Sequence, residues 1–146
     1  MSWPRYDDAN VKANELLYRR VDVQDVVDAH LLAVEQQAAR IGFDRYIISA
    51  TSPFGANDAK LLCRDAHSVL ARCVPRFAAE YARRRWTMFP GIDRIYVNHK
   101  ARSELGWQPR YDFSAAIERL SRGEEYRSPL ALAIGPKGYH PHRRSP

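Results

Sequence analysis

The sequence of 146 residues has few of the residues that mark special classes of protein. It contains two cysteines, Cys63 and Cys73, and no Cys-x-x-Cys pair, so neither a disulfide framework nor a cysteine-based metal site is expected. No apolar run approaches the roughly 18 residues that a membrane-spanning helix needs. The polar N-terminus also lacks the apolar block of a secretory signal. From these absences we expect a cytoplasmic protein without a membrane anchor.

The seven glycines never fall at the Gly-x-Gly-x-x-Gly spacing of a dinucleotide-binding turn. Only glycine lets the backbone approach a pyrophosphate closely at the start of a helix. We therefore expect this chain to bind no NAD or NADP by itself, and we assign it no cofactor-binding residue.

The two cysteines lie ten residues apart in a stretch, residues 58–73, that the apolar spacing predicts to be one helix. Ten residues of helix would separate them by roughly 15 Å, which is too far for a disulfide. His67 is the single histidine between them, and one histidine does not complete a metal site. We expect two buried thiols and no metal.

The clearest helix signal begins at Asp22, which is placed to cap a helix starting at Val23. Asp25 adds negative charge near the positive end of this helix, and Gly42 is placed to close it. Its apolar stripe is predicted to face inward and consists of Val23, Val26, Val27, His30, Leu31, Val34 and Ala38.

Shorter signals divide the rest of the chain. Residues 1–17 are polar and are predicted to be a junction, and β-branched and aromatic residues predict strands over 45–49 and 92–97. Helical turns are predicted over 77–85, and a short helix is predicted from a cap at Asn98 to Gly106. The last predicted helix ends at Gly123, and its inward stripe consists of Phe113, Ala116, Ile117 and Leu120. Proline, glycine and positive charge predict a tail over residues 127–146.

Positive charge is concentrated in one part of the chain. The formal net charge is +6, and residues 76–110 alone carry eight basic and three acidic side chains. Three of the basic residues are consecutive, at positions 83–85. Because the arginine fork matches paired phosphate oxygens, this segment is a candidate anion site.

Two stretches resemble a known family: residues 18–33, YRRVDVQDVVDAHLLA, and residues 93–113, DRIYVNHKARSELGWQPRYDF. Together they are similar to the C-terminal, substrate-side portion of the extended short-chain dehydrogenase/reductases, the NAD-dependent epimerase/dehydratases of the UDP-glucose 4-epimerase type. The resemblance implies an α/β fold, in which residues 18–126 form a mainly helical substrate-binding lobe with a few short strands. The Gly-rich, nucleotide-binding half of the Rossmann-type enzyme is missing from the chain.

The resemblance also implies a ligand, a nucleoside diphosphate sugar, and the residues that would hold it. Arg19 and Arg20 lie beside the position of a family arginine that meets the diphosphate. The family has a second phosphate-binding arginine upstream of the stretch that resembles residues 100–107, and Arg84 and Arg85 lie near that position. The full-length family uses NAD or NADP. A Rossmann-type half or a second copy of the chain is the implied protein partner.

We assign no catalytic residue. The family's proton relay uses a tyrosine with a lysine four residues later, and Tyr96 and Lys100 have this spacing. In the family, however, the pair precedes the segment that resembles residues 18–33, whereas Tyr96 follows it. We therefore expect the isolated chain to be inactive.

A second interpretation is a non-catalytic module that binds anions or another protein, based on the basic segment. Nucleic acid is not the expected partner, because aromatic residues are not interleaved with the basic ones as a single-strand platform requires.

Overall fold

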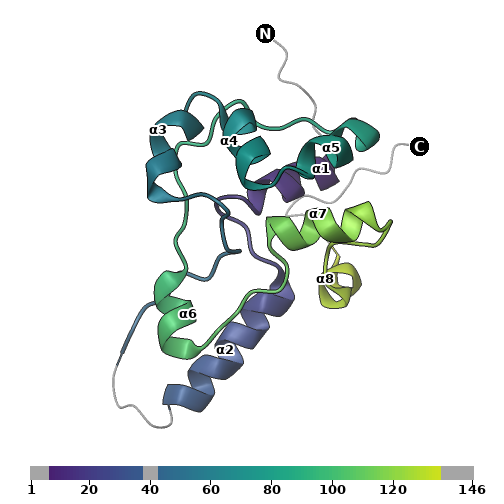
Figure 1. The fold of residues 1–146 in the computed structure, drawn as a ribbon. Helices are drawn as coiled ribbons and strands as arrows, with labels where there is room; N and C mark the ends of the chain where they lie inside the picture. Colours follow the sequence, from purple (N-terminus) through teal and green to yellow (C-terminus); the bar gives the residue numbers. More distant parts are fainter. Residues whose placement is uncertain (1–6, 38–42, 136–146) are drawn as a thin grey trace, which may run out of the picture.

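The computed structural model describes residues 7–37 and 43–135 (Figure 1). Within these residues the helices are α1 Asp8–Glu15, α2 Val23–Gln37, the 3-10 turn η1 Ala56–Asp58, α3 Ala59–Leu62, α4 Ala66–Cys73, α5 Phe77–Arg84, α6 His99–Leu105, α7 Phe113–Ser121 and α8 Pro129–Ile134. Helices α1, α3, α4, α5 and α7 gather in one part of the molecule, and α2 and α6 form an arm below it in Figure 1.

The predicted α/β fold is wrong, because the described part of the chain is helical and contains no strand. The two predicted strands, 45–49 and 92–97, run instead as irregular segments next to the chain that links α1 to α2. Ala50 N donates to Arg20 O, and Tyr96 N donates to Tyr18 O, each at 2.8 Å. A strand pair repeats its hydrogen bonds along a ladder, whereas these bonds are isolated, so neither segment forms a sheet.

The structure also corrects the two ends of the chain. The predicted junction contains α1, whose buried face consists of Asn10, Ala13 and Asn14. This helix escaped prediction because its inward residues are largely polar: both asparagine side chains donate to Thr87 O, at 3.1 and 2.9 Å. The predicted tail contains α8, which starts at a proline, the residue best suited to the first turn of a helix.

The predicted helix over 58–73 is broken into η1, α3 and α4. The break between α3 and α4 lies before Asp65. The Asp65 side chain accepts a hydrogen bond from Ser68 N at 3.0 Å and so caps α4 as a new helix. Cys63, at the break, is exposed, Cys73 is half-buried, and both are free thiols. The prediction of two buried thiols is therefore wrong for Cys63.

Helix α2 begins where it was predicted, but most of its predicted apolar stripe faces outward, and Val23 and Val26 are only half-buried. Val27, Leu31 and Val34 are 37%, 58% and 71% exposed, whereas Asp25 and Ala29 are buried. The helix is oriented by the hydrogen bonds of its buried aspartate, described below, rather than by its apolar stripe. His30 is also exposed, and Ala38 and Gly42 lie outside the described residues.

Three other predicted helices are confirmed. Helix α5 lies within 77–85, and α6 follows Asn98 and closes at Gly106 with φ of +65°, a left-handed conformation that favours glycine. Helix α7 buries Phe113, Ala116, Ile117 and Leu120, as its spacing predicted.

Two hydrophobic clusters hold these helices. The larger lies among α1, α4, α5 and α7 and includes Leu17, Leu70, Phe77, Tyr81 and Phe113. The smaller joins α2 to α6 and has four buried members, Ala29, Ala101, Leu105 and Trp107. The arm of α2 and α6 therefore depends on a small core dominated by one indole.

Gly91 gives the first testable prediction. A Cβ at this position would lie 2.5 Å from Cys63 O, and the segment cannot move away freely because Ile92 N donates to Leu62 O at 2.9 Å. We expect Gly91→Ala to lower the free energy of unfolding by about 2 kcal/mol, as overpacking typically does. Urea unfolding followed by circular dichroism measures this loss.

Gly55→Ala is the matched control. Its Cβ would meet its nearest neighbour, Asp58 Oδ2, at an ordinary 3.7 Å. If Gly91→Ala lowers the free energy of unfolding no more than Gly55→Ala does, the backbone at residues 62–63 can shift to make room for the added Cβ.

Candidate functional site

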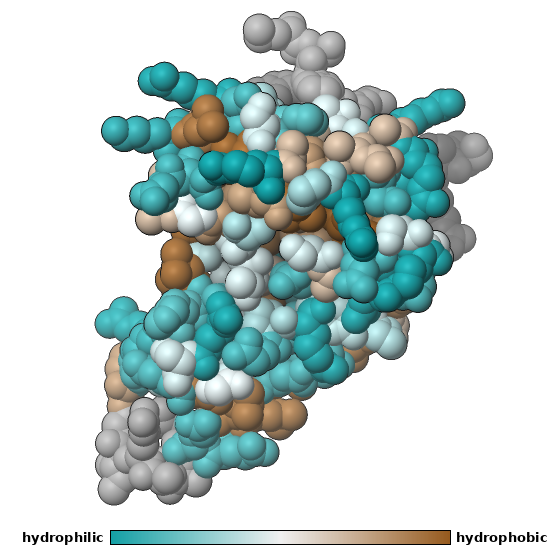
Figure 2. Space-filling model, in the orientation of Figure 1, coloured by the Kyte–Doolittle hydropathy of each residue, from teal (hydrophilic) through white to brown (hydrophobic). Residues whose placement is uncertain are grey.

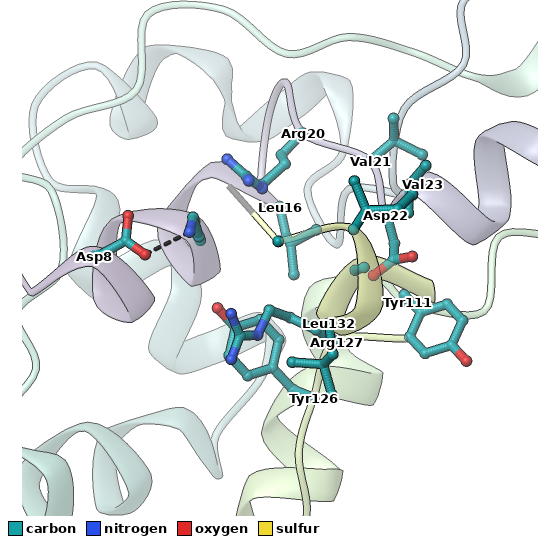
Figure 3. A pocket seen from close by; sticks show the side chains of 14 residues that line it. Asp8, Leu16, Arg20, Val21, Asp22, Val23, Tyr111, Tyr126, Arg127 and Leu132 are labelled. Atoms are coloured by element: carbon teal, nitrogen blue, oxygen red, sulfur yellow. Dashed lines mark hydrogen bonds and ion pairs between the residues drawn. The ribbon is translucent and has the colours of Figure 1, made fainter. Parts of the chain in front are cut away.

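A cleft of about 510 Å³ lies between α1, the link from α1 to α2, and α8 (Figure 3). We call it the α1–α8 cleft. Three cationic side chains line it, Lys12 from α1, Arg20 from the link and Arg127 from the segment before α8. Tyr111 and Tyr126 add aromatic surface. The arrangement brings together cations from parts of the chain that are more than a hundred residues apart.

Each of the three cations already has a carboxylate partner. Lys12 pairs with Asp8, Arg20 Nη1 lies 2.7 Å from Glu15 Oε2, and Arg127 Nε lies 2.9 Å from Glu125 Oε1. Hydrogen bonding to Arg127 lowers the pKa of Glu125, so this carboxylate stays ionised at neutral pH. An anionic ligand in the cleft must therefore share or displace these carboxylates.

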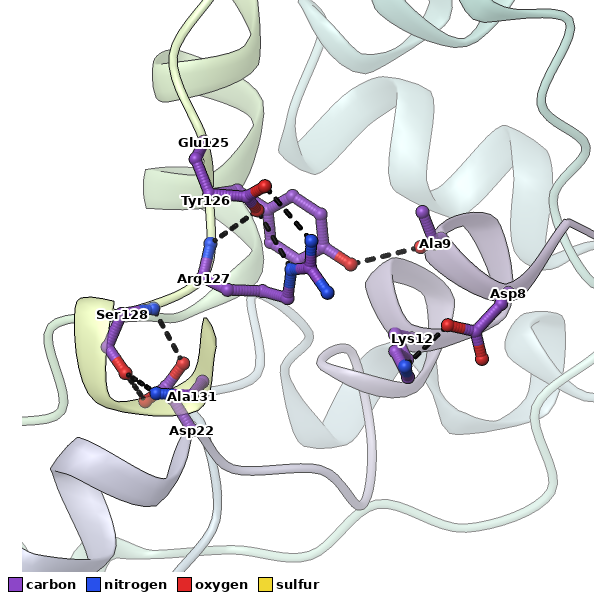
Figure 4. Close-up of polar contacts among 9 residues, drawn as sticks. All are labelled: Asp8, Ala9, Lys12, Asp22, Glu125, Tyr126, Arg127, Ser128 and Ala131. Atoms are coloured by element: carbon purple, nitrogen blue, oxygen red, sulfur yellow. Dashed lines mark hydrogen bonds and ion pairs between the residues drawn. The ribbon is translucent and has the colours of Figure 1, made fainter. Parts of the chain in front are cut away.

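Tyr126 is a neutral hydrogen-bonding group on the wall of the cleft. Burial raises the pKa of its phenol to about 12. The hydroxyl donates to Ala9 O at 3.1 Å, which ties the segment before α8 to α1 (Figure 4). The Tyr126 ring therefore provides packing surface and carries no charge.

Asp22 fixes the position of α8. Ser128 N donates to Asp22 Oδ2 at 3.0 Å, and Ser128 Oγ donates to Asp22 Oδ1 at 2.5 Å (Figure 4). The same carboxylate caps α2 by accepting from Gln24 N at 2.9 Å, as the sequence predicted for Asp22. Ser128 in turn caps α8 by accepting from Ala131 N. One buried carboxylate thus links the first turns of two helices.

Asp25 has a structural role on the other side of α2. Its carboxylate accepts from Arg110 N at 2.9 Å and from Tyr111 N at 3.0 Å. Trp107 Nε1 donates to the backbone oxygen of Asp25 at 2.9 Å. Burial raises the pKa of this carboxyl, and the two backbone donors oppose that rise. Asp25 therefore fixes the chain after α6 against α2.

The four arginines predicted to bind substrate are not brought together. Arg20 lines the α1–α8 cleft, whereas Arg19 is exposed and pairs with Glu15. Arg84 Nη2 donates to Leu120 O at 3.3 Å, and Arg85 ends α5 with φ of +58°. Neither of them lines the cleft. Substrate binding by Arg19, Arg84 and Arg85 stays a prediction without support from this geometry.

Sequence reasoning missed two of the cations in the cleft, Lys12 and Arg127. They belong to the predicted junction and to the start of the predicted tail, two segments in which the apolar residues show no helical or strand spacing. The available signal was Pro129 directly after Ser128, a pattern typical of a helix start.

Tyr96 and Lys100 are not placed as a proton relay. Tyr96 lies in an irregular segment, and Lys100, on α6, pairs with Asp44 and lies over the Tyr46 ring at 4.8 Å. Among the described residues no group of three or more His, Cys, Asp or Glu side chains is arranged to hold a metal ion.

No protein-family model matches the chain, and no curated protein or solved structure matches it either. None of the helices in residues 7–37 and 43–135 is long and apolar enough to cross a membrane.

Proposed function

We propose that this chain binds a nucleoside diphosphate sugar in the α1–α8 cleft, as the substrate-side portion of an NAD-dependent epimerase/dehydratase. One observation carries the proposal: Lys12, Arg20 and Arg127 converge on a cleft whose volume of about 510 Å³ is in the range of small-molecule sites. Arg20 belongs to the stretch that resembles the family, and it is the predicted arginine found in the cleft. The diphosphate lies against the cations, and the chemistry requires NAD or NADP, for which these residues provide no Gly-rich turn.

Arg20→Ala tests this assignment. The change removes a charge-assisted, two-pronged contact worth about 1.5–3 kcal/mol, so we expect uridine diphosphate to bind about ten- to a hundred-fold more weakly. Arg20→Lys recovers part of the loss, because lysine keeps the charge without the fork. Isothermal titration calorimetry measures the affinities.

Arg122→Ala is the matched control, because Arg122 is also surface-exposed and also pairs with a glutamate, Glu118. We expect it to leave the affinity unchanged. If Arg20→Ala, Arg84→Ala and Arg122→Ala all weaken binding by the same small factor, the chain acts through diffuse positive charge, and the cleft assignment fails.

The outward stripe of α2 favours a second candidate function, a protein-interaction module that assembles with a second copy of itself. Val27, Leu31 and Val34 form an exposed row at helical spacing on the side of α2 opposite buried Ala29. Figure 2 shows apolar side chains on the outside of the molecule in the lower part, where Figure 1 places α2. Contiguous exposed apolar surface promotes association.

We therefore expect dimers or larger species at tens of micromolar in sedimentation velocity experiments. Leu31→Asp combined with Val34→Asp places charge on the row and shifts the chain to monomer. Because both side chains are largely exposed, the double variant keeps its fold. A wild-type chain that sediments as a sharp monomer would contradict self-assembly through this face.

A further inference from the structure

The residues that line the α1–α8 cleft are of two chemically different kinds. Lys12, Arg20 and Arg127 are cationic, and beside them lies a set of apolar side chains that we call the apolar wall. That wall consists of Leu16, Val21, Val23, Ala131, Leu132 and Ile134. In Figure 3 the side chains of Leu16, Val21 and Leu132 lie beside those of Arg20 and Arg127. A small phosphate ion would contact the cations and leave the apolar wall open to water.

Helix α8 contributes half of this wall, and its composition is unusual for an exposed helix. Its six residues, PLALAI, are all apolar, yet none of them is buried. Leu132 and Ile134 are 45% and 49% exposed. A surface helix ordinarily turns a polar face to water, so the open apolar side chains of α8 favour an apolar contact that the chain itself does not supply.

The position of α8 depends on few polar contacts. Helix α8 packs on α2 with half-buried side chains only, and its first turn is tied down by Ser128, which is fully buried and bonds to both carboxylate oxygens of Asp22. Asp22 itself lines the cleft. The carboxylate that caps α2 is therefore also bonded to the first turn of α8, the helix that carries half of the apolar wall.

We infer that the cleft selects a diphosphate that carries a large uncharged group, which packs against Leu132 and Ile134 of α8, and that Asp22 is the positioning residue that holds this wall through Ser128. The inference rests on the proposed function for the diphosphate contacts and adds the recognition of the uncharged group. Two sources share this chemistry, a nucleoside diphosphate with its base and ribose and a prenyl diphosphate with its hydrocarbon chain.

Calorimetric titration of the full chain with three probes tests the inference: inorganic diphosphate, uridine diphosphate and geranyl diphosphate. Burying apolar surface adds affinity in proportion to area, so at least one organic diphosphate should bind about ten- to a hundred-fold more tightly than inorganic diphosphate. The tighter of the two identifies the source. If geranyl diphosphate is preferred, the inference stands and the nucleoside part of the proposed function fails.

Two variants locate the selectivity. Leu132→Asn combined with Ile134→Asn should abolish the preference for the organic diphosphate while leaving the affinity for inorganic diphosphate unchanged. Ser128→Ala removes the Oγ bond to Asp22 and the side-chain cap of α8, while the bond from the backbone N remains, and it should reduce the same preference. The ratio of the two affinities is informative because a general loss of fold lowers both together.

The outcomes distinguish a failure of the inference about the uncharged group from a failure of the proposed diphosphate site. If inorganic diphosphate binds as tightly as both organic probes, the phosphate site stands and the inference is overturned. If none of the three binds, the proposed function fails, and the inference fails with it. A preference that survives the double Asn variant also overturns the role of α8.

Discussion

Asp25→Ala should lower the free energy of unfolding by about 3 kcal/mol, one of the two largest losses expected from a single substitution in this chain. The carboxylate is fully buried and accepts from two backbone donors, Arg110 N and Tyr111 N. Removing it leaves Tyr111 N without an acceptor in a buried position and Arg110 N without one in a partly buried position, and each buried loss costs about 1–3 kcal/mol. The substitution also removes the unfavourable burial of the Asp25 charge, which offsets part of this cost. Urea unfolding measures the difference.

Asp28→Ala is the control for this substitution. Asp28 lies one turn further along α2 and pairs with Arg110 at 2.7 Å, but this pair is exposed to solvent. Surface ion pairs contribute about 0–1 kcal/mol. An Asp25→Ala loss as small as that of Asp28→Ala would show that water reaches the two backbone donors.

The pH dependence of the Asp25 contribution has a definite sign. Burial raises the pKa of Asp25 above its ordinary value of 3.8, so the folded chain binds this proton more tightly than the unfolded chain. Between the raised pKa and 3.8, the Asp25 contribution to stability therefore grows as the pH falls, and it is lost as the pH rises. The wild type should gain stability relative to Asp25→Asn over this window, because asparagine does not titrate there.

The sequence predicted those helices whose ends and buried faces are set by residues within the helix itself or next to it. The glycine that closes α6 and the four-residue stripe of α7 specify these helices within a few residues of sequence. Helix α1 could not be found in this way. Its buried asparagines become suitable core residues only when Thr87, more than seventy positions away, supplies their partners.

The orientation of α2 shows where apolar periodicity misleads. The periodicity correctly indicated a helix, but it pointed to the wrong inward face. Two backbone donors at positions 110 and 111 and the Trp107 indole bond to Asp25, so the side of the helix that carries Asp25 and Ala29 is the one that faces the protein. A rule that places apolar residues inside cannot anticipate a carboxylate whose partners come from a distant segment.

The candidate site was predictable in one residue, Arg20. The resemblance indicated both arginines of residues 18–33, and the cleft contains Arg20 but not Arg19. Lys12 and Arg127 both line it, and the bond from Tyr126 to Ala9 ties the segment before α8 to α1. Arg84 is directed elsewhere by the Leu120 oxygen, a contact across 36 residues that no local pattern indicates.

Trp107→Ala should lower the free energy of unfolding by about 3–5 kcal/mol. The indole is 1% exposed and is the largest side chain in the cluster that joins α2 to α6, where two of the other three buried members are alanines. These small neighbours cannot fill the cavity left behind, and the hydrogen bond from Nε1 to the Asp25 oxygen is lost as well. Trp107→Phe keeps much of the ring and should cost about half as much.

The loss from Trp107→Ala should also be localised. The larger cluster among α1, α4, α5 and α7 shares no buried residue with the smaller one, so amide hydrogen exchange should accelerate in α2 and α6 before it does in α5 and α7. Gln108→Ala, an exposed neighbour, is the control and should change stability by less than about 0.5 kcal/mol. Uniform acceleration across all helices in Trp107→Ala would instead mean that the two clusters unfold as one unit, and that the arm of α2 and α6 has no separate stability.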